Sequence, residues 1–352
     1  MIGVSEALKG VPVLVTGASG FIGRRLVACL QASGADVSII ARSTEGARMK
    51  GVRVHRGALA AGKALDAALA GQAILFHLAY DIRAGMDANL AAFDALYQAA
   101  ERAGVGRIVH ASSIVVYRDW PAGPLTEAAP VSDGPQGPYR RAKIEMEARL
   151  AAGQIPCAML QPTLVYGPGS ALWTDAPIAM LKQGPVILPD PVGICPAVYV
   201  DDVVAAAMRA AVLPDLGAER FIINGPPGLD WRGFFEGYAG IIGQGGVETR
   251  PVDELTTRLG PAPTGPPPGP SLAARVSAVA RQMIGRQRFE ALVGKARALR
   301  PASGPTYPDR GQLGLYSAQH PIPGTHAAQR LGFQPQIDFA AGLDKIKAKM
   351  PQ

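Results

Sequence analysis

The chain has 352 residues, 48% of them hydrophobic and 18% charged, which is enough apolar material for a sizeable core and excludes a wholly disordered protein. Its three cysteines lie far apart without a CxxC pair and its five histidines lack metal-ligand spacing, so we expect neither a disulfide framework nor a metal site. Nearly the whole net charge of +7 comes from residues 271–300, which argues against a nucleic-acid-binding surface spread over a domain.

Short apolar strands alternate with helices through the first half of the chain. This alternation implies a parallel sheet covered on both faces, that is, an α/β fold of the Rossmann type with a doubly wound parallel sheet. Ligands of such sheets bind beyond the carboxyl ends of the strands, so we expect the functional residues there. The pattern predicts strands at 11–16, 35–41, 74–78, 106–112 and 155–161, and helices at 21–32, 86–103 and 139–152.

The first predicted strand runs into a glycine-rich turn, TGASGFIG at 16–23. In this TGxxGxxG pattern Gly17 permits a tight turn, Gly20 lets the backbone approach a pyrophosphate, and Gly23 lets helix and strand pack closely. The position between a strand and a helix favours dinucleotide binding over an ordinary turn, because the helix N-terminus presents free N–H groups to the phosphates. The residues expected to hold the cofactor phosphates are Gly17, Ser19, Gly20, Phe21, Ile22 and Gly23.

The end of the second predicted strand bears on the choice of cofactor. NAD-binding proteins place an Asp or Glu there for the ribose 2′-hydroxyl, but this chain has Arg42, 19 residues after Gly23. The guanidinium can pair with a 2′-phosphate, so we expect NADP(H), with NAD(H) as the alternative. A solvated arginine just past a strand end is the structural alternative.

A tyrosine and a lysine four residues apart, Tyr139 and Lys143, occur in the helix predicted at 139–152. Positions i and i+4 share a helix face, so the phenol and the ammonium point the same way. A nearby ammonium lowers the pKa of a tyrosine from about 10, which lets Tyr139 exchange a proton with an alcohol or ketone. The alternative is an ordinary surface pair.

Two hydroxyls, Ser112 and Ser113, follow the strand predicted at 106–112. A serine at the carboxyl end of a parallel strand can hydrogen-bond a substrate carbonyl or alkoxide. A polar strand exit is the alternative interpretation, because serine is common in turns.

In this order, the motifs resemble those of the extended short-chain dehydrogenases/reductases, the group that includes the NAD-dependent epimerases and dehydratases. TGASGFIG at 16–23 is similar to the nucleotide motif of that family, and FHLA at 76–79 to the segment beside its cofactor. Asn89 and the Ser113, Tyr139 and Lys143 set stand at the family's usual positions. Later matches are QPTLVYGPG at 161–169, VYVDDV at 198–203, RLGFQP at 330–335 and AGL at 341–343.

The resemblance implies roles for particular residues. It makes Ser113, Tyr139 and Lys143 the catalytic residues, with Lys143 also on the nicotinamide ribose. It also implies cofactor contacts at Leu78, Ala79, Pro162 and Thr163, and substrate contacts at Tyr80, Ser113 and Tyr166.

The chain departs from the family pattern in ways that bear on the substrate. Gln161 replaces the usual arginine, and Ala58 stands where many members have an aspartate near the adenine. Leu164 replaces an asparagine that usually helps to hold a sugar diphosphate, which argues against a standard nucleotide sugar. Ile114 follows Ser113 where a dehydratase usually has a carboxylate.

The sequence therefore predicts an NADP(H)-dependent oxidoreductase that interconverts a ketone and a secondary alcohol, either apolar or sugar-derived. Tyr139 would be the general acid/base and Ser113 would orient the substrate oxygen. One alternative is a sugar or nucleotide-sugar epimerase or dehydratase without net redox change. An alternative of another class is a non-catalytic NAD(P)-binding regulatory protein, although the complete catalytic set argues against it.

The parallel alternation breaks down in the later part of the chain. We expect a Rossmann domain at 1–166 plus about 198–224, and a smaller C-terminal substrate-binding lobe at about 167–197 plus 225–352. A run rich in Pro and Gly at 261–270 reads as a linker or loop within that lobe.

Two adjacent carboxylates, Asp201 and Asp202, precede the apolar helix predicted at 203–211. They could form an acid pair for catalysis or metal binding. We favour the structural interpretation, in which they cap the helix and stabilise its start.

The basic segment 271–300 has apolar residues at helical spacing. Such a helix can lie on an anionic membrane surface, serve as a lid or partner site, or simply turn its arginines to water. No apolar run approaches the roughly 18 residues of a membrane span, and unpaired cysteines fit a reducing cytoplasm. We expect a cytoplasmic protein, with peripheral membrane contact as an option, and the family suggests a homodimer through helices 86–103 and 139–152.

Overall fold

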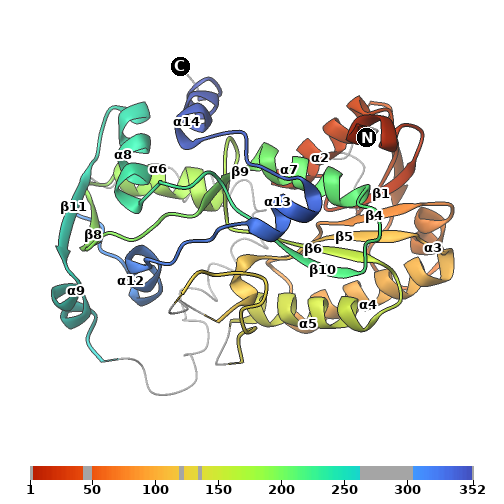
Figure 1. The fold of residues 1–352 in the computed structure, drawn as a ribbon, viewed down its shortest axis with the longest axis horizontal. Coiled ribbons are helices and arrows are strands. Elements are labelled where there is room, and N and C mark those ends of the chain that lie inside the picture. Colours follow the sequence, from red (N-terminus) through yellow and green to blue (C-terminus); the bar gives the residue numbers. More distant parts are fainter. Residues whose placement is uncertain (1–2, 43–49, 119–122, 134–136, 262–303, 351–352) are drawn as a thin grey trace, which may run out of the picture. The chain divides into compact units, whose positions relative to one another are not determined.

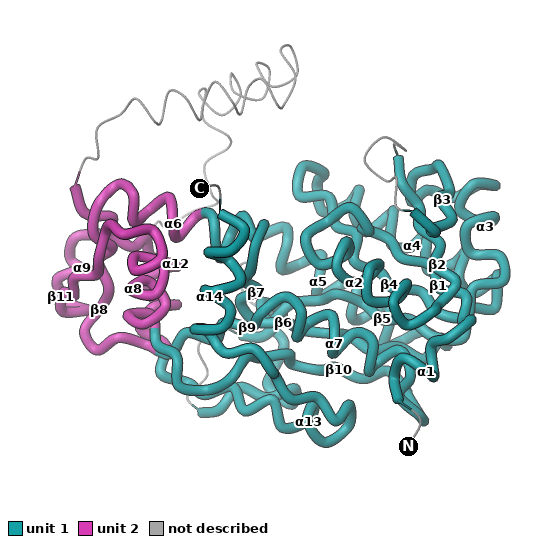
Figure 2. The backbone as a smooth tube through the Cα atoms, turned by 90° about the horizontal axis from the view of Figure 1, so that it is seen from above, with its two compact units in different colours: residues 1–175, 194–230, 319–352 teal, residues 176–193, 231–318 magenta. Residues whose placement is uncertain are grey.

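A computed structural model describes residues 3–42, 50–118, 123–133, 137–261 and 304–350. The predicted basic segment 271–300, and all but residue 261 of the predicted linker, lie outside these ranges. The chain divides into two compact units (Figure 2), unit 1 at 1–175, 194–230 and 319–352, and unit 2 at 176–193 and 231–318. Within the described ranges, none of the helices is long and apolar enough to cross a membrane.

Unit 1 contains a seven-stranded parallel sheet, so the predicted doubly wound α/β fold is confirmed (Figure 1). The strand order is β10-β6-β5-β4-β1-β2-β3, and the ends of the five predicted strands fall within two residues of the observed ones. The strands are β1 (Pro12–Thr16), β2 (Asp36–Ala41), β3 (Arg53–Arg56), β4 (Ile74–His77), β5 (Arg107–Ala111), β6 (Cys157–Pro162) and β10 (Ala218–Ile223).

Side chains of the sheet alternate between two cores, one on each face. On β1, Val13 and Val15 pack into one core and Leu14 into the other, as the two-residue period of a strand requires. Figure 1 shows α2 and α7 on one side of the sheet and α4 and α5 on the other. The covering helices are α2 (Phe21–Ala32), α3 (Lys63–Leu69), α4 (Met86–Ala103), α5 (Pro138–Ala152) and α7 (Val200–Ala211).

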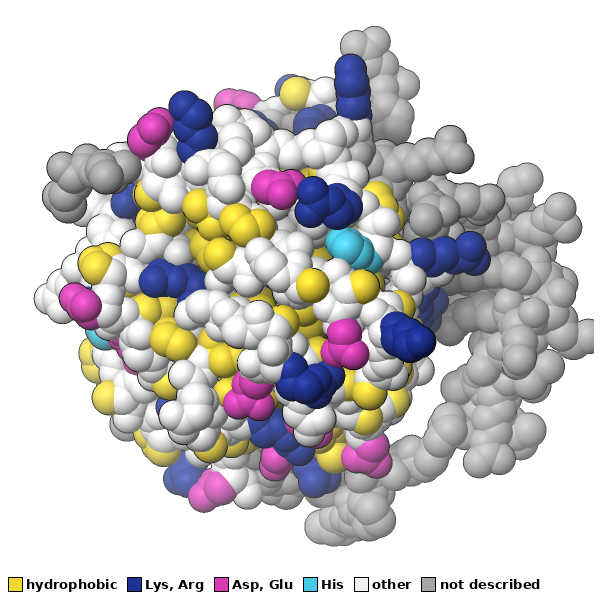
Figure 3. Space-filling model, turned by 90° about the vertical axis from the view of Figure 1, so that its right-hand side faces the viewer, with side chains coloured by type: hydrophobic (Ala, Val, Ile, Leu, Met, Phe, Trp, Pro, Cys, Tyr) yellow, Lys and Arg dark blue, Asp and Glu magenta, His cyan; other side chains and the backbone are white. Residues whose placement is uncertain are grey.

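The edge strand β3 was not predicted from the sequence. Its residues Arg53–Arg56 read RVHR, and none of them is fully buried. Because β3 pairs only with β2 in the sheet, it needs no apolar run of its own. Figure 3 views this side of the molecule and shows basic and acidic side chains interspersed on it.

Residues 319–352 pack with unit 1, whereas the sequence assigned them to the substrate-binding lobe. The helix α13 (Thr325–Leu331) inserts Ala327 and Leu331 into the same core as α2 and α7. Its Arg330 also makes two hydrogen bonds to Glu219 of β10, at 2.9 and 2.6 Å. These contacts join segments more than 100 residues apart, so the chain order could not show them.

The predicted capping role of Asp201 and Asp202 is wrong. Helix α7 begins at Val200, so both aspartates lie inside its first turn, where a negative charge still favours the helix dipole. Asp202 is buried and accepts hydrogen bonds from the backbone N–H groups of Gln336 and Ile337, at 3.0 and 3.1 Å. Asp202 therefore anchors the C-terminal segment to the sheet-covering helix.

Replacing Asp202 by alanine is expected to destabilise the fold by about 1–3 kcal/mol, because two partly buried backbone N–H groups lose their acceptor. Asp201→Ala is the matched control, since it breaks only a half-exposed ion pair with Arg25 and should cost about 0.2–1 kcal/mol. Denaturant unfolding of the two variants measures the difference. Equal losses would show that the C-terminal segment does not depend on Asp202.

Unit 2 is smaller and is built around aromatic side chains. It pairs the parallel strands β8 (Val186–Asp190) and β11 (Val247–Pro251), with α6 (Ala176–Leu181), α8 (Trp231–Ile242), α9 (Val252–Leu259) and α12 (Arg310–Ser317). Trp231 packs against Phe234, Phe235 and Tyr316 in edge-on or tilted contacts, and all four are almost fully buried. These aromatics form the core of the unit.

Candidate active site

The glycine turn sits between β1 and α2, next to β4, where the order of the strands reverses direction. Gly17 has a φ of +71°, and a Cβ on it would come within 2.8 Å of the backbone nitrogen of Ala79. A Cβ on Gly23 would lie 2.2 Å from the carbonyl oxygen of Gly17. Positions 17 and 23 therefore have room only for glycine, and the turn lies directly against Leu78 and Ala79.

Hydrogen bonds hold this turn to the end of β4. The Thr16 hydroxyl contacts His77 Nδ1 at 2.8 Å and accepts from the Ala79 N–H at 3.3 Å. His77 is buried, and this burial lowers its pKa to about 3, so the ring is neutral and its bond to Thr16 carries no charge. The donors of the α2 N-terminus beyond Gly20 are thereby kept in a fixed place.

Arg42 lies at the end of β2, as predicted, and meets a carboxylate that the sequence did not reveal. Its guanidinium is 3.1 Å from Asp81 and its side chain is 69% exposed. Arg83 holds the same carboxylate more closely, with two hydrogen bonds of 2.8 Å. These bonds, those of Arg83 above all, hold the pKa of Asp81 well below its usual range, so the cluster has two positive charges and one negative.

Tyr139 and Ser113 come together beyond the carboxyl end of β5. Ser113 caps the short 3₁₀ helix η1 (Ile114–Val116), and its hydroxyl also hydrogen-bonds with Tyr139. Tyr80 packs edge-on against the Tyr139 ring at 4.9 Å. Tyr139 itself is 39% exposed, which leaves it accessible to a small molecule.

Lys143 lies one helical turn after Tyr139 on α5 and is buried. Its Nζ donates to the Ala111 carbonyl at the end of β5 at 2.6 Å and lies 5.3 Å from the Tyr80 ring centre and 5.8 Å from that of Tyr139. Burial lowers the pKa of Lys143 to about 8. The ammonium is thus held at the strand end by a backbone acceptor.

The expected lowering of the Tyr139 pKa is not found in this arrangement. Desolvation raises the pKa of Tyr139, and only the hydrogen bond with Ser113 acts in the opposite direction. Lys143 has no such effect because its ammonium donates to Ala111 and approaches the face of the Tyr139 ring. Ser113 is therefore the group that favours the phenolate here.

The other predicted residues lie in two places, with Pro162 and Thr163 at the edge of the sheet that carries the cofactor turn and Tyr166 against the C-terminal segment. Pro162 ends β6 and Thr163 follows it, with its hydroxyl 3.3 Å from the Ile223 carbonyl on β10, at the same edge of the sheet as the cofactor turn. Tyr166 is buried and donates to the Asp338 carbonyl at 3.0 Å, so its hydroxyl is engaged by the C-terminal segment. This placement argues against the predicted substrate contact of Tyr166.

A buried network behind Lys143 was missed by the sequence reasoning. Glu147 lies one further turn along α5, is 1% exposed, and accepts hydrogen bonds from Ser112, from Gln161 at 2.9 Å and from Arg220 at 2.7 Å. Its spacing of four residues from Lys143 is a signal that the sequence contains. Arg220 carried no signal, because it comes from β10.

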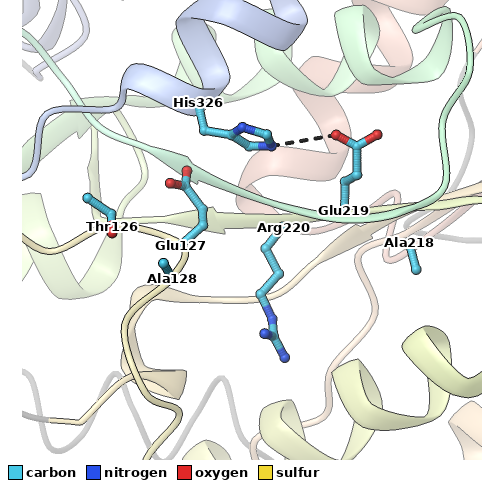
Figure 4. Close-up of a pocket in the computed structure, with 7 residues that line it drawn as sticks. All are labelled: Thr126, Glu127, Ala128, Ala218, Glu219, Arg220 and His326. Atoms are coloured by element: carbon cyan, nitrogen blue, oxygen red, sulfur yellow. Dashed lines mark ion pairs between the residues drawn. The ribbon is translucent and has the colours of Figure 1, made fainter.

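A groove of about 440 Å³ opens near the start of β10, away from the carboxyl ends of the strands. Glu219 and His326 form an ion pair of 3.5 Å on its wall (Figure 4). None of the predicted site residues is among the described residues that line it, which are Thr126, Glu127, Ala128, Ala218, Glu219, Arg220 and His326.

Comparisons with known proteins indicate the family of the chain. A family model described as NAD dependent epimerase/dehydratase family matches residues 13–224. The chain is 31% identical over 263 residues to a UDP-glucose 4-epimerase of Mycolicibacterium smegmatis, covering 65% of this chain and 82% of that protein. It is 30% identical over 268 residues to a 3-diazoavenalumate denitrifying reductase of Streptomyces sp., covering 70% and 86%.

The fold is also shared with solved structures. MoeE5 in complex with UDP-glucose and NAD superposes with a TM-score of 0.66 at 24% identity, covering 96% of this chain and 97% of that one. At this identity the likeness shows the fold alone.

Proposed function

The chain belongs to the NAD dependent epimerase/dehydratase family of NAD(P)-dependent enzymes, and from that premise we propose that it is an NADP(H)-dependent oxidoreductase interconverting a ketone and a secondary alcohol. The observation that carries this proposal is the accessible Tyr139, hydrogen-bonded with Ser113 and one turn from the buried Lys143. A hydroxyl pair beside a buried ammonium suits proton exchange with a substrate oxygen.

The residues around the glycine turn fit a dinucleotide. The space that a Cβ on Gly17 or Gly23 would fill is closed by backbone, so the turn stays tight, and the N–H groups in the first turn of α2 would approach a pyrophosphate. When bound, NAD(P)H would supply the hydride for a carbonyl carbon. Leu78, Ala79 and Thr163 would line the same strand ends.

The chain's own side chains would handle the proton. In reduction, Tyr139 gives its hydroxyl proton to the substrate oxygen while Ser113 holds that oxygen in place. Lys143 does not lower the pKa of Tyr139 in this structure; its ammonium would lie at the nicotinamide ribose, beside the groups that exchange the proton, and in the oxidation direction the same groups act in reverse. The pKa of Tyr139 is raised in this structure, so the hydroxyl is protonated at neutral pH and can act as the acid in reduction.

NADP(H) is the cofactor that we favour, because Arg42 is held by one bond while Arg83 takes most of the Asp81 carboxylate. Arg42 therefore stays available for a 2′-phosphate. The MoeE5 structure was solved with NAD, and Asp81 could itself accept from a ribose hydroxyl, so NAD(H) is the alternative.

We expect calorimetry to show NADPH binding at least about tenfold tighter than NADH, because a charge-assisted pair is worth about 1.5–3 kcal/mol. Arg42→Ala should remove most of this difference while leaving NADH binding nearly unchanged. The protein should then consume NADPH with a panel of cyclic ketones and keto-sugars. Tight binding without net oxidation on any of them would favour the epimerase or a non-catalytic binding protein.

The epimerase is kept as the second candidate because the Mycolicibacterium smegmatis relative is a UDP-glucose 4-epimerase. An epimerase would be distinguished by its conversion of a sugar nucleotide while the cofactor stays bound and no net redox change occurs. A homodimer through α4 and α5, a cytoplasmic location and peripheral membrane contact through 271–300 stay predictions from the sequence.

A further inference from the structure

The Glu147 network lies next to the proposed proton-transfer residues but has no part in the mechanism above. Glu147 occupies the position one turn after Lys143 on the buried face of α5. Ser112, which donates to it, directly precedes Ser113 in the chain. The network therefore touches both elements that carry the proposed catalytic groups, the end of β5 and the helix α5.

One positive charge, the Arg220 guanidinium, balances the Glu147 carboxylate in this network. Arg220 Nε donates to it at 2.7 Å, whereas Ser112 and Gln161 are neutral. Gln161 is itself fixed by the Tyr117 hydroxyl, which donates to its side-chain oxygen at 2.5 Å. The carboxylate is thus fully hydrogen-bonded, which a buried charge requires.

Arg220 reaches Glu147 because successive residues of β10 face opposite sides of the sheet. Figure 4 shows Arg220 extending away from the Glu219–His326 pair. Glu219 is bound by Arg330 on the other face, at 2.9 and 2.6 Å. The strand therefore carries two Arg–Glu pairs, of which only one adjoins Lys143.

Apart from Glu147, the titratable groups that surround Lys143 in the described part of the chain are uncharged. His77 and His110 are buried with lowered pKa values, so both rings are neutral, and Tyr80 and Tyr139 have raised pKa values. Burial lowers the pKa of Lys143 to about 8, and Glu147 acts in the opposite direction.

The groups around Glu147 are neutral too, apart from Arg220. Burial raises the pKa of Cys157 to about 12 and also raises that of Tyr117, and the negative charge of Glu147 adds to both shifts. Glu127 also raises the pKa of Tyr117, by less than Glu147 does, and it accepts a hydrogen bond from the Ile222 N–H at 2.8 Å. Glu147 is thus the anion that supports the ammonium of Lys143.

We propose that Glu147, held by Arg220, Ser112 and Gln161, is a positioning residue that keeps Lys143 charged and fixed beside Tyr139. This inference rests on the proposed function, because it assigns a task to Lys143 in the same proton transfer. Glu147 acts only through Lys143 and touches no reacting atom.

The test is the pH profile of kcat/KM for NADPH-dependent reduction by the full chain. Activity falls as the pH rises through the pKa of Lys143, because the ammonium is lost. Glu147→Gln keeps the size of the side chain but removes its charge, so the alkaline limb should move to lower pH by about one unit. An unmoved limb in the folded variant would overturn the proposal.

Glu147→Asp separates charge from position and serves if the glutamine variant does not fold. It keeps the anion but withdraws it by one methylene, so the limb should stay in place while kcat falls at least about tenfold, as small misplacements of catalytic groups do. Wild-type kcat in Glu147→Asp would contradict the positioning role.

Arg330→Gln is the matched control, since it breaks the Arg–Glu pair on the opposite face of β10. It should lower the melting temperature without moving the pH limb. A limb that moves equally in this variant would assign the effect to general loosening of β10 and overturn the proposal. If Tyr139→Phe retained turnover, the proposed function itself would fail, whatever Glu147 does.

Discussion

Tyr139→Phe is expected to reduce kcat for ketone reduction by about 10²–10⁴-fold, the usual contribution of a positioned general acid. The substitution removes only the hydroxyl that meets Ser113. The Phe ring can keep the edge-on contact with Tyr80, whose centroid lies 4.9 Å away, so the pocket should keep its shape. NADPH affinity is therefore expected to change by no more than about twofold, since a uniform binding contact is not removed.

Steady-state kinetics with NADPH, together with calorimetry of cofactor binding, measures both effects. Tyr97→Phe is the matched control, because the Tyr97 hydroxyl on α4 accepts from the backbone N–H of Gln154, at 3.0 Å, and its other partners are Ile155 and Glu101, none of them a proposed site residue. It should lose some stability and keep its turnover. Near-normal turnover in Tyr139→Phe would remove Tyr139 from the mechanism.

Gly23→Ala is expected to weaken binding of NADPH and NADH alike by at least about tenfold. The added Cβ would lie 2.2 Å from the Gly17 carbonyl oxygen and 2.9 Å from Ala18 Cα, both of them backbone atoms. Backbone cannot rotate away as a side chain can, so the turn must open. Opening it displaces the N–H groups at the start of α2 and costs about 1–3 kcal/mol of stability as overpacking.

Gly85→Ala is the control for this effect of a methyl group. Gly85 precedes α4 with a φ of −66°, and a Cβ there meets nothing within 4 Å. Its cofactor affinity and melting temperature should stay close to those of the wild type. If Gly23→Ala bound NADPH normally, the turn at 16–23 would not be the phosphate site.

The three variants address different parts of the same proposed site. Gly23→Ala should weaken both cofactors equally, whereas Arg42→Ala should weaken only NADPH. Tyr139→Phe should spare both affinities and remove turnover. Each pattern follows from the place proposed for the residue: under the phosphates, at the adenosine ribose, or at the substrate.

Local features of the site were predictable because they depend on neighbours along the chain. The glycine turn between β1 and α2 follows from steric limits that hold over eight residues. Tyr139 and Lys143 share a face because a helix repeats every 3.6 residues. The strands β1, β4, β5 and β6 were recognisable because both faces of a covered parallel sheet are apolar.

The pairings across the sheet could not be read from the sequence. Arg220 meets Glu147 only because β10 lies beside β6, and these residues are 73 positions apart. Asp81 reaches Arg42 because β4 and β2 flank β1, with their carboxyl ends at one edge. The charged neighbours of each proposed functional group could therefore be identified only once the strand order was known.

The sequence by itself determined the glycine turn, five of the seven strands of the sheet and the proposed Ser113, Tyr139 and Lys143 set, since each depends on short-range geometry or an apolar run. Only the tertiary structure decided that Ser113, and not Lys143, favours the Tyr139 phenolate, and that Tyr166 is taken up by the C-terminal segment. The reason is that pKa values and hydrogen-bond partners depend on burial and on residues from distant strands. The distances between such residues are set by tertiary packing, and no periodic pattern in the sequence reveals them.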